Sequence, residues 1–181
     1  MIEIRPARPG EETRQKELWK LSFGDDDAYI DYFYTHRPAG VETLVLLEDG
    51  ALETMVALFP VTLSLPDGAR ASSAYIYALA THPGARKKGF GRFILNYVDF
   101  YLQEKKLDCV TIVPAEASLH RFFAAAGFSE CFATRKVELL QYMARRNCAL
   151  YQFSPPMTAA ASGAARSSRP SRSAVPPAAP P

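Results

Sequence analysis

The residues whose types and spacing best suit chemistry form a short basic loop, Arg86-Lys87-Lys88-Gly89-Phe90-Gly91, with Arg92 directly after it. An apolar repeat of helical spacing follows, so the two glycines stand where a helix begins. The first turn of a helix has unpaired backbone N–H groups and a partial positive charge, and both attract phosphate oxygens. Glycine also lets a ligand approach the backbone closely. The loop therefore predicts a site for a pyrophosphate or a similar anion.

Two other glycine-rich phosphate loops do not fit these residues. A Walker loop needs Lys and then Ser or Thr after Gly89, where the chain has Phe90 and Gly91. A dinucleotide fingerprint that begins at Gly89 needs a small residue where Ile94 stands. Taken alone, Arg-x-x-Gly-x-Gly is a weak signal, and an ordinary strand-to-helix turn with solvated lysines explains it equally well.

The elements around the loop place it between a strand and a helix. A β-rich run over residues 71–81 precedes it, and an amphipathic helix is expected over residues 92–105. The short apolar run 109–113 is typical of a buried central strand. A further helix is expected over residues 119–126, with Ser118 as its N-cap. This order predicts that the loop connects the sheet to a helix packed on it.

The N-terminal half predicts one strand, two helices and a three-stranded meander. Asp49-Gly50 lies between two β-rich runs and indicates a hairpin turn. Tyr29, Tyr32 and Phe33 recur at helical spacing and are expected to form one packing face. The expected elements are a strand over 1–5, helices over 11–23 and 28–36, strands over 42–47, 51–65 and 71–81, and a last strand over 132–140. The fold class is therefore α/β, with a mixed, mostly antiparallel central sheet flanked by helices.

Composition excludes several classes of protein. The 181 residues are 48% hydrophobic, which suffices for the core of one soluble domain. The formal net charge of +2 includes Arg166, Arg169 and Arg172 near the C-terminus, so the rest of the chain is close to −1 and nucleic-acid binding is disfavoured. Three cysteines without ligand spacing support neither a disulfide framework nor a metal site. No signal peptide or membrane span is present, so a cytoplasmic location fits best and no membrane partner is expected.

The C-terminal composition suggests where the domain stops. From Ser154 onward the chain is rich in Pro, Ala and Ser and has no aromatic residue, so it cannot bury enough apolar surface to offset its ordering entropy. We expect a folded domain over residues 1–142, a domain end or linker over 143–153 and a disordered tail over 154–181. The abrupt onset of the tail is equally compatible with a truncated or out-of-frame end.

The wider context of the loop resembles a known family. Leu79-Ala80-Thr81-His82-Pro83 precedes the loop, and the later helix closes on Ala126-Gly127-Phe128. The stretch 75–128 is similar to the GNAT superfamily of acetyl-CoA-dependent N-acetyltransferases, which share this order and both motifs. The resemblance implies a splayed parallel pair formed by the strands over 75–81 and 109–113, with the pantetheine arm of acetyl-CoA in the gap.

The resemblance also implies which residues bind acetyl-CoA. The backbone of Leu79, Ala80 and Thr81 would pair with the pantetheine arm, and one N–H near Leu79 or Ala80 would polarise the thioester carbonyl. The pyrophosphate would lie on the basic loop and the residue after it. The implied cofactor-binding residues are Leu79, Ala80, Thr81, Arg86, Lys87, Lys88, Gly89, Phe90, Gly91 and Arg92. Acetyl transfer to a primary amine of a small molecule or peptide would follow by direct attack, without a metal, and a homodimer stays open as the assembly.

One departure from the family pattern concerns catalysis. Many relatives have a Tyr that protonates the departing thiolate where this chain has Phe123, which carries no proton to give. We expect Phe123→Tyr to raise acetyl transfer if the rest of the site is intact. His120, Tyr75 and Tyr77 are weak catalytic candidates, and packing or surface roles are favoured for all of them. A shortened C-terminal end adds to this concern, so the alternative function is a CoA-binding regulatory module with little or no turnover.

Overall fold

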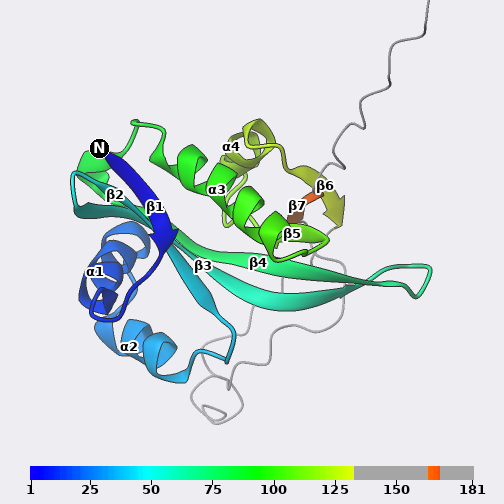
Figure 1. Cartoon of the computed structure of the whole chain (residues 1–181), viewed down its shortest axis with the longest axis horizontal. Coiled ribbons are helices and arrows are strands. Elements are labelled where there is room, and N and C mark those ends of the chain that lie inside the picture. The colour runs from blue at the N-terminus through cyan, green and yellow to red at the C-terminus, as the bar shows by residue number, and fades with distance from the viewer. Residues whose placement is uncertain (133–162, 168–181) are drawn as a thin grey trace, which may run out of the picture.

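The computed structural model describes residues 1–132 and the backbone of 163–167 (Figure 1). A central sheet lies between two pairs of helices. The strands are β1 (Ile2–Pro6), β2 (Glu42–Glu48), β3 (Ala51–Ser64), β4 (Arg70–Thr81), β5 (Cys109–Ile112), β6 (Ser129–Phe132) and β7 (Gly163–Ser167). The helices are α1 (Glu12–Phe23), α2 (Asp27–His36), the 3-10 turn η1 (Pro83–Ala85), α3 (Phe90–Glu104) and α4 (Leu119–Ala125).

The sheet has the order β1-β2-β3-β4-β5-β7-β6. Every neighbouring pair is antiparallel except β4 and β5, which are parallel. Parallel neighbours need a crossover, and here α3 connects β4 to β5. The mixed, mostly antiparallel α/β sheet expected from the sequence is confirmed.

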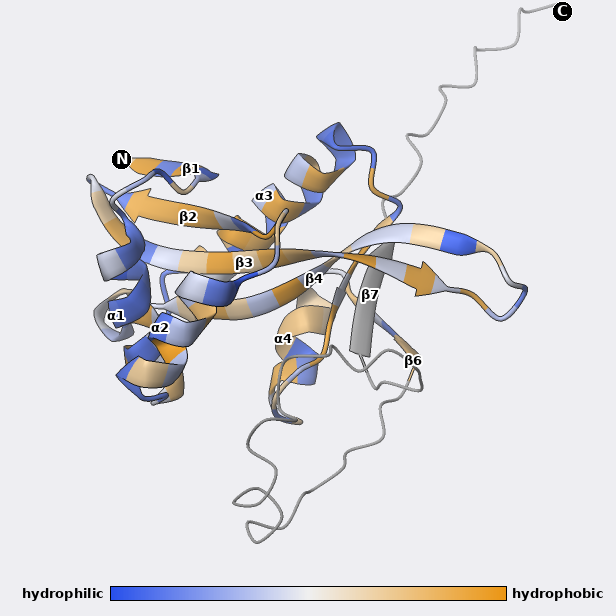
Figure 2. Ribbon diagram, turned by 90° about the horizontal axis from the view of Figure 1, so that it is seen from below, coloured by the Kyte–Doolittle hydropathy of each residue, from blue (hydrophilic) through white to orange (hydrophobic). Residues whose placement is uncertain are grey.

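Two hydrophobic cores lie on opposite faces of the sheet. On the face covered by α3 and α4, here called the α3 face, Ile94 and Val98 pack on Leu44 and Ile76. On the face covered by α1 and α2, here called the α1 face, Trp19 and Phe33 form the second core. They pack on the strand residues whose side chains point to this face of the sheet. Successive strand residues point to opposite faces, so β2 supplies both cores and appears apolar along most of its length in Figure 2.

Most expected boundaries hold within one or two residues. α1 ends at Gly24, whose φ of 73° is left-handed, and the Asp49-Gly50 hairpin joins β2 to β3. α3 begins at Phe90, two residues before the expected start. Ser118 is the N-cap residue of α4, as expected, but its hydroxyl donates to the Glu116 carboxylate and makes no cap hydrogen bond.

The C-terminal part of the chain differs from expectation in one segment. Gly163–Ser167 falls in the tail expected to be disordered, yet it forms β7 and pairs with both β5 and β6. A strand can join a sheet through backbone hydrogen bonds alone, and the lack of apolar side chains in this segment does not prevent that pairing. The expected strand over 132–140 lies outside the described residues except for Phe132, which ends β6.

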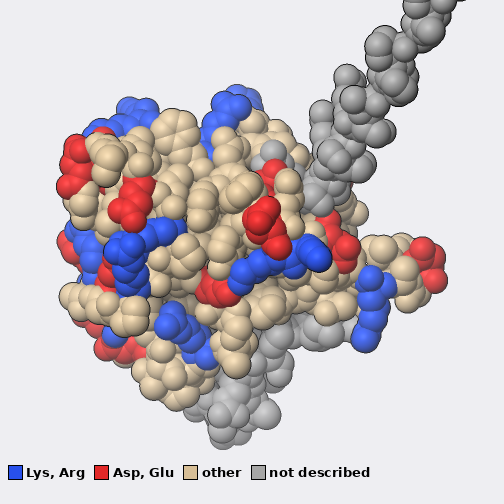
Figure 3. Space-filling view, in the orientation of Figure 1, with Lys and Arg blue, Asp and Glu red and all other residues tan. Residues whose placement is uncertain are grey.

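Surface features agree with a small net charge. On the side shown in Figure 3, the Lys and Arg side chains of the described residues are interspersed with Asp and Glu and form no continuous basic patch. No helix within residues 1–132 is long and apolar enough to cross a lipid bilayer.

Candidate active site

The parallel strands β4 and β5 pair over only a short distance. Their register joins Ser73 to Cys109, Ala74 to Val110 and Tyr75 to Thr111, and then pairing stops. β4 continues to Thr81, so residues 76–81 lie beside β3 on one side and beside no described strand on the other. The expected divergence of this pair toward its C-terminal ends is confirmed. It leaves backbone N–H and C=O groups of β4 available to a ligand.

A β-bulge in β4 lies beside the end of this pairing. Tyr77 pairs with Ala57 and Ala80 pairs with Met55, so two residues of β4 stand opposite the single residue Val56. Ala78 has a φ of 48°, an unusual value for a residue other than glycine. The extra residue reverses the alternation of side chains, so Ala80 is buried on the α1 face although Ala74 and Ile76 are buried on the α3 face. Because its side chain is buried, Ala80 can contact a ligand only through its backbone.

The basic loop, residues 86–91, has the backbone that an anion site requires. Lys87 and Gly89 have φ values of 67° and 83°, and Gly89 is the N-cap of α3. The N–H groups of Arg92 and Phe93 donate to the Gly89 carbonyl at 2.9 and 3.0 Å. Within the described residues, the N–H groups of residues 87–91 have no acceptor. These amides surround the positive end of the α3 dipole.

The two glycines of the loop are needed for different reasons. A Cβ on Gly89 would meet only the Phe93 ring, at 3.9 Å, so space is available there but the left-handed φ favours glycine. A Cβ on Gly91 would lie 3.2 Å from the Phe122 ring, because the first turn of α3 packs closely on α4. Gly89 therefore sets the shape of the loop, and Gly91 sets the distance between the two helices.

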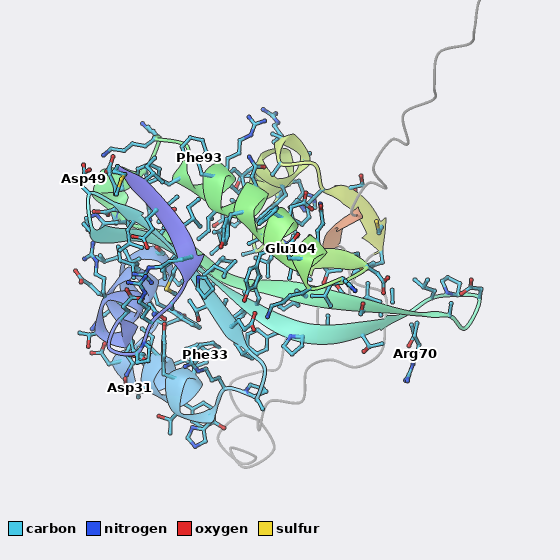
Figure 4. The ribbon with its side chains drawn as sticks, in the orientation of Figure 1. Asp31, Phe33, Asp49, Arg70, Phe93 and Glu104 are labelled. Atoms are coloured by element: carbon cyan, nitrogen blue, oxygen red, sulfur yellow. The ribbon has the colours of Figure 1, made fainter. Side chains whose placement is uncertain are left out.

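The side chains of the basic loop are not equally free to meet an anion. Lys88 Nζ donates to the Glu48 carboxylate at 2.6 Å, and this hydrogen bond raises the pKa of Lys88. Figure 4 shows Asp49, next to Glu48, toward the same end of the molecule as Phe93 in the first turn of α3. Arg86 Nε donates to the Thr81 carbonyl at 3.4 Å.

The other residues of the basic loop, together with Arg92, include one buried residue and two exposed cations. Phe90, the first residue of α3, is buried with 3% of its surface exposed, so only its backbone N–H can reach a ligand. Lys87 and Arg92 are exposed, and no hydrogen bond or ion pair engages their side chains within the described residues. These two cations are the ones best placed to add charge to the amides.

Phe123, which stands where many relatives have a tyrosine hydroxyl, belongs to a packed core. Phe123 is 3% exposed, and its ring meets the Phe122 and Phe128 rings edge-on at centroid distances of 5.0 and 5.6 Å. His120, one turn earlier, is half-buried, and its Nδ1 lies 2.7 Å from the Glu130 carboxylate on β6. His120 thus links α4 to β6.

Tyr75 and Tyr77 lie together on the α1 face, with ring centroids 6.4 Å apart. The Tyr77 hydroxyl is 2.9 Å from the Tyr29 hydroxyl on α2, and its ring packs on Trp19 at 5.5 Å. Burial raises the pKa of both Tyr75 and Tyr77, so both phenols stay protonated near neutral pH. The favoured packing role fits Tyr77, and its hydroxyl also faces the connection between α1 and α2.

The acidic residues of that connection suit the start of the second helix, but their place beside Tyr77 was not predicted from the sequence. Trp19 Nε1 donates to the Asp25 carboxylate at 2.7 Å, and Asp26 caps α2 through the Tyr29 N–H. Tyr29 and Tyr32 are 39% and 41% exposed, so α2 does not bury the three aromatic residues expected to form one packing face. The signal was the run Gly24-Asp25-Asp26-Asp27 between two helices rich in aromatic residues. Acidic and aromatic groups therefore adjoin Tyr77 on the α1 face.

Comparison with known proteins agrees with this geometry. A family model described as an acetyltransferase (GNAT) domain matches residues 3–128. A search of the curated proteins gives no match. Three of the solved structures that share the fold are bacterial proteins. A GCN5-related N-acetyltransferase from Anabaena variabilis has a TM-score of 0.66 and 14% identity, over 73% of this chain and 33% of that one.

The other two structures come from different bacteria. A conserved protein of unknown function from Enterococcus faecalis has a TM-score of 0.61 and 18% identity, over 73% of this chain and 33% of that one. A GNAT family acetyltransferase from Brucella melitensis, in complex with acetyl-CoA, has a TM-score of 0.57 and 18% identity, over 71% of this chain and 83% of that one. The chain thus spans about a third of the length of the Anabaena and Enterococcus proteins. Because the family model covers more than half of the sequence, the chain belongs to the GNAT family of acetyltransferase domains.

Proposed function

We propose that this domain transfers an acetyl group from acetyl-CoA to a primary amine of a small molecule or peptide, by direct attack of the amine on the thioester. The observation that carries the proposal is the continuity of two backbone features. The unpaired edge of β4 over residues 76–81 leads through η1 to the amides of residues 87–91, none of which has an acceptor within the described residues.

The residues present fit acetyl-CoA in chemistry and in order along the chain. The amides of residues 87–91 and the positive end of α3 suit a pyrophosphate, and Lys87 and Arg92 add charge without competing partners. Leu79, Ala80 and Thr81 offer backbone groups to the amides of a pantetheine arm. Bound acetyl-CoA would supply an activated acetyl group attached to a sulfur leaving group.

The bulge at Ala78 suits the reacting end of the site. It reorients the backbone just before Leu79, and an N–H of Leu79 or Ala80 would donate to the thioester oxygen as negative charge develops there. The amine nitrogen forms the new bond to the carbonyl carbon, the carbon–sulfur bond breaks, and the nitrogen loses one proton. Phe123 cannot protonate the thiolate, so we propose that water accepts the proton from the nitrogen and delivers a proton to the departing thiolate.

The amine is proposed to approach from the α1 face. Tyr77 and Tyr29 present hydroxyl groups there, and Asp25 adds a negative charge beside Trp19. Protonated amines bind favourably beside carboxylates and aromatic rings. These hydroxyl, carboxylate and aromatic groups favour an amine as the acceptor over an acidic molecule.

A second candidate function is a CoA-binding regulatory module with little turnover. The buried ring of Phe123 favours it, because no hydroxyl stands where many relatives protonate the thiolate. This candidate retains acetyl-CoA binding and loses only the acceptor chemistry.

Two measurements separate these functions. Calorimetric titration with acetyl-CoA tests cofactor binding, and thiol release over a panel of primary amines tests transfer. Binding with amine-dependent thiol release is the result expected of the acetyltransferase. Binding with no release for any amine favours the module, and no binding contradicts both.

A further inference from the structure

A buried carboxylate lies beneath the start of the basic loop. Glu53 belongs to β3 at a register shift, where Leu46 pairs with Thr54 and Leu47 pairs with Leu52, so Glu53 itself has no partner on β2. Its side chain is 16% exposed, and the oxygen Oε2 is buried without a hydrogen-bond partner. An ionised oxygen in that position is costly unless opposite charges stand close by.

Two groups from different elements approach this oxygen. His82 Nδ1 lies 3.5 Å from Glu53 Oε2, and Arg14 of α1 lies 3.7 Å from the same atom. Both distances are longer than ordinary hydrogen bonds, and the Arg14 contact joins two opposite charges. Arg14 is itself fixed, because its Nε donates to the Leu52 carbonyl at 3.0 Å and its guanidinium pairs with Glu17 at 2.8 Å. Glu53 is therefore held between α1 and the end of β4.

His82 contacts Glu53 through its backbone as well as its ring. The His82 N–H donates to the Glu53 carbonyl at 2.8 Å, and the His82 carbonyl accepts from the Ala85 N–H at 2.9 Å. The ring also faces Gly84, where an added Cβ would lie 3.4 Å from Nδ1. His82 thus joins β3 to the turn η1, which leads directly into the basic loop.

From these contacts we propose that Glu53 and His82 are a pair of positioning residues that fixes the direction in which the chain leaves β4 and enters the basic loop. The pair does not touch acetyl-CoA. It holds the loop in the conformation that the amides need, and a small displacement of those amides weakens the site. The inference rests on the proposed function, because it concerns the same acetyl-CoA site.

The test compares affinity with stability. We expect His82→Ala and Glu53→Ala each to weaken acetyl-CoA binding by about two- to tenfold in calorimetry at 25 °C, the factor for one lost polar contact. The double variant should weaken binding no more than the stronger single variant, because both act through one contact. His82→Asn keeps a polar group near the position of Nδ1 and should restore most of the affinity. His36→Ala and Glu104→Gln are matched controls on exposed side chains outside the site, and both should bind like the wild type.

The pattern of results identifies the role. A positioning role raises KM for acetyl-CoA and leaves kcat nearly unchanged, whereas a merely structural role lowers the melting temperature and leaves the affinity of the folded protein intact. Equal affinity of the wild type and both alanine variants, or simple additivity in the double variant, overturns the inference while the proposed function stands. Failure of the wild type to bind acetyl-CoA overturns both.

Discussion

Lys88 and Glu48 form an ion pair across the end of the sheet, with Lys88 Nζ 2.6 Å from the Glu48 carboxylate. One cation of the basic loop is therefore directed toward β2. Lys88→Ala should weaken acetyl-CoA binding less than Arg92→Ala, which should cost roughly two- to fivefold as an exposed charge contact. Glu48→Gln should strengthen binding slightly, because it removes a negative charge and frees Lys88. Calorimetry at low salt checks the order, and a larger loss for Lys88→Ala would show that Lys88 leaves Glu48 when the anion binds.

Phe123→Tyr tests the position of the missing hydroxyl. The sequence alone predicts a gain of transfer, but the ring is 3% exposed within the core of the α3 face. A hydroxyl added there lacks water and a described partner, so we expect a loss of about 1–3 kcal/mol in the free energy of unfolding. Thermal and urea unfolding measure it, with the matched surface variant Phe122→Tyr as control. An unchanged stability together with faster transfer would show that the hydroxyl reaches the reacting atoms.

The buried tyrosines predict how stability depends on pH. Burial raises the pKa of Tyr34 and Tyr77 above the value of an exposed phenol, chiefly through desolvation. The unfolded chain then loses these protons first, so stability is complete below about pH 10 and falls as pH rises above it. Tyr77→Phe should make this alkaline decline shallower. Urea unfolding between neutral and alkaline pH checks the slope, and equal slopes for wild type and variant would contradict the assignment.

Two truncations test the role of β7. Removing residues 168–181 should leave the melting temperature nearly unchanged. Removing residues 154–181 also removes β7, which pairs with β5 from Cys109 to Ile112, and should lower the melting temperature by several degrees. Equal melting temperatures for the two truncations would mean that β5 and β6 do not depend on this strand, as the composition of the tail first indicated.

Local signals allowed the fold around the basic loop to be predicted. The strands β4 and β5, the helix that begins at the loop and the hairpin at Asp49-Gly50 follow from hydrophobic spacing and turn residues. These features depend on residues close together in the chain. The resemblance to a family then supplied both the parallel pairing of β4 with β5 and the divergence of the two strands.

The features that sequence did not predict are tertiary pairings. The bulge at Ala78 depends on the register between β3 and β4, and no glycine or proline marks it. The ion pair of Lys88 with Glu48 joins residues 40 positions apart. The sequence around Glu53 does not distinguish it from a surface carboxylate, and only the fold brings Arg14 and His82 to it. Backbone pairing of β7 is likewise invisible in a composition of small residues.

The amides at the start of α3 are proposed to bind the pyrophosphate of acetyl-CoA. Gly91→Glu places a side chain and a negative charge in the first turn of α3, where a Cβ alone would lie 3.2 Å from the Phe122 ring. Gly91→Ala is the matched control, because the far end of the exposed Phe122 ring can yield to a single methyl group.

The most direct test is calorimetric titration of the wild type and of both Gly91 variants with acetyl-CoA and with acetyl-pantetheine, which lacks the pyrophosphate. We predict that the wild type and Gly91→Ala bind acetyl-CoA far more tightly than acetyl-pantetheine, and that Gly91→Glu abolishes this preference while remaining folded. Equal affinity of the wild type for the two ligands, or an unchanged preference in Gly91→Glu, would contradict the account.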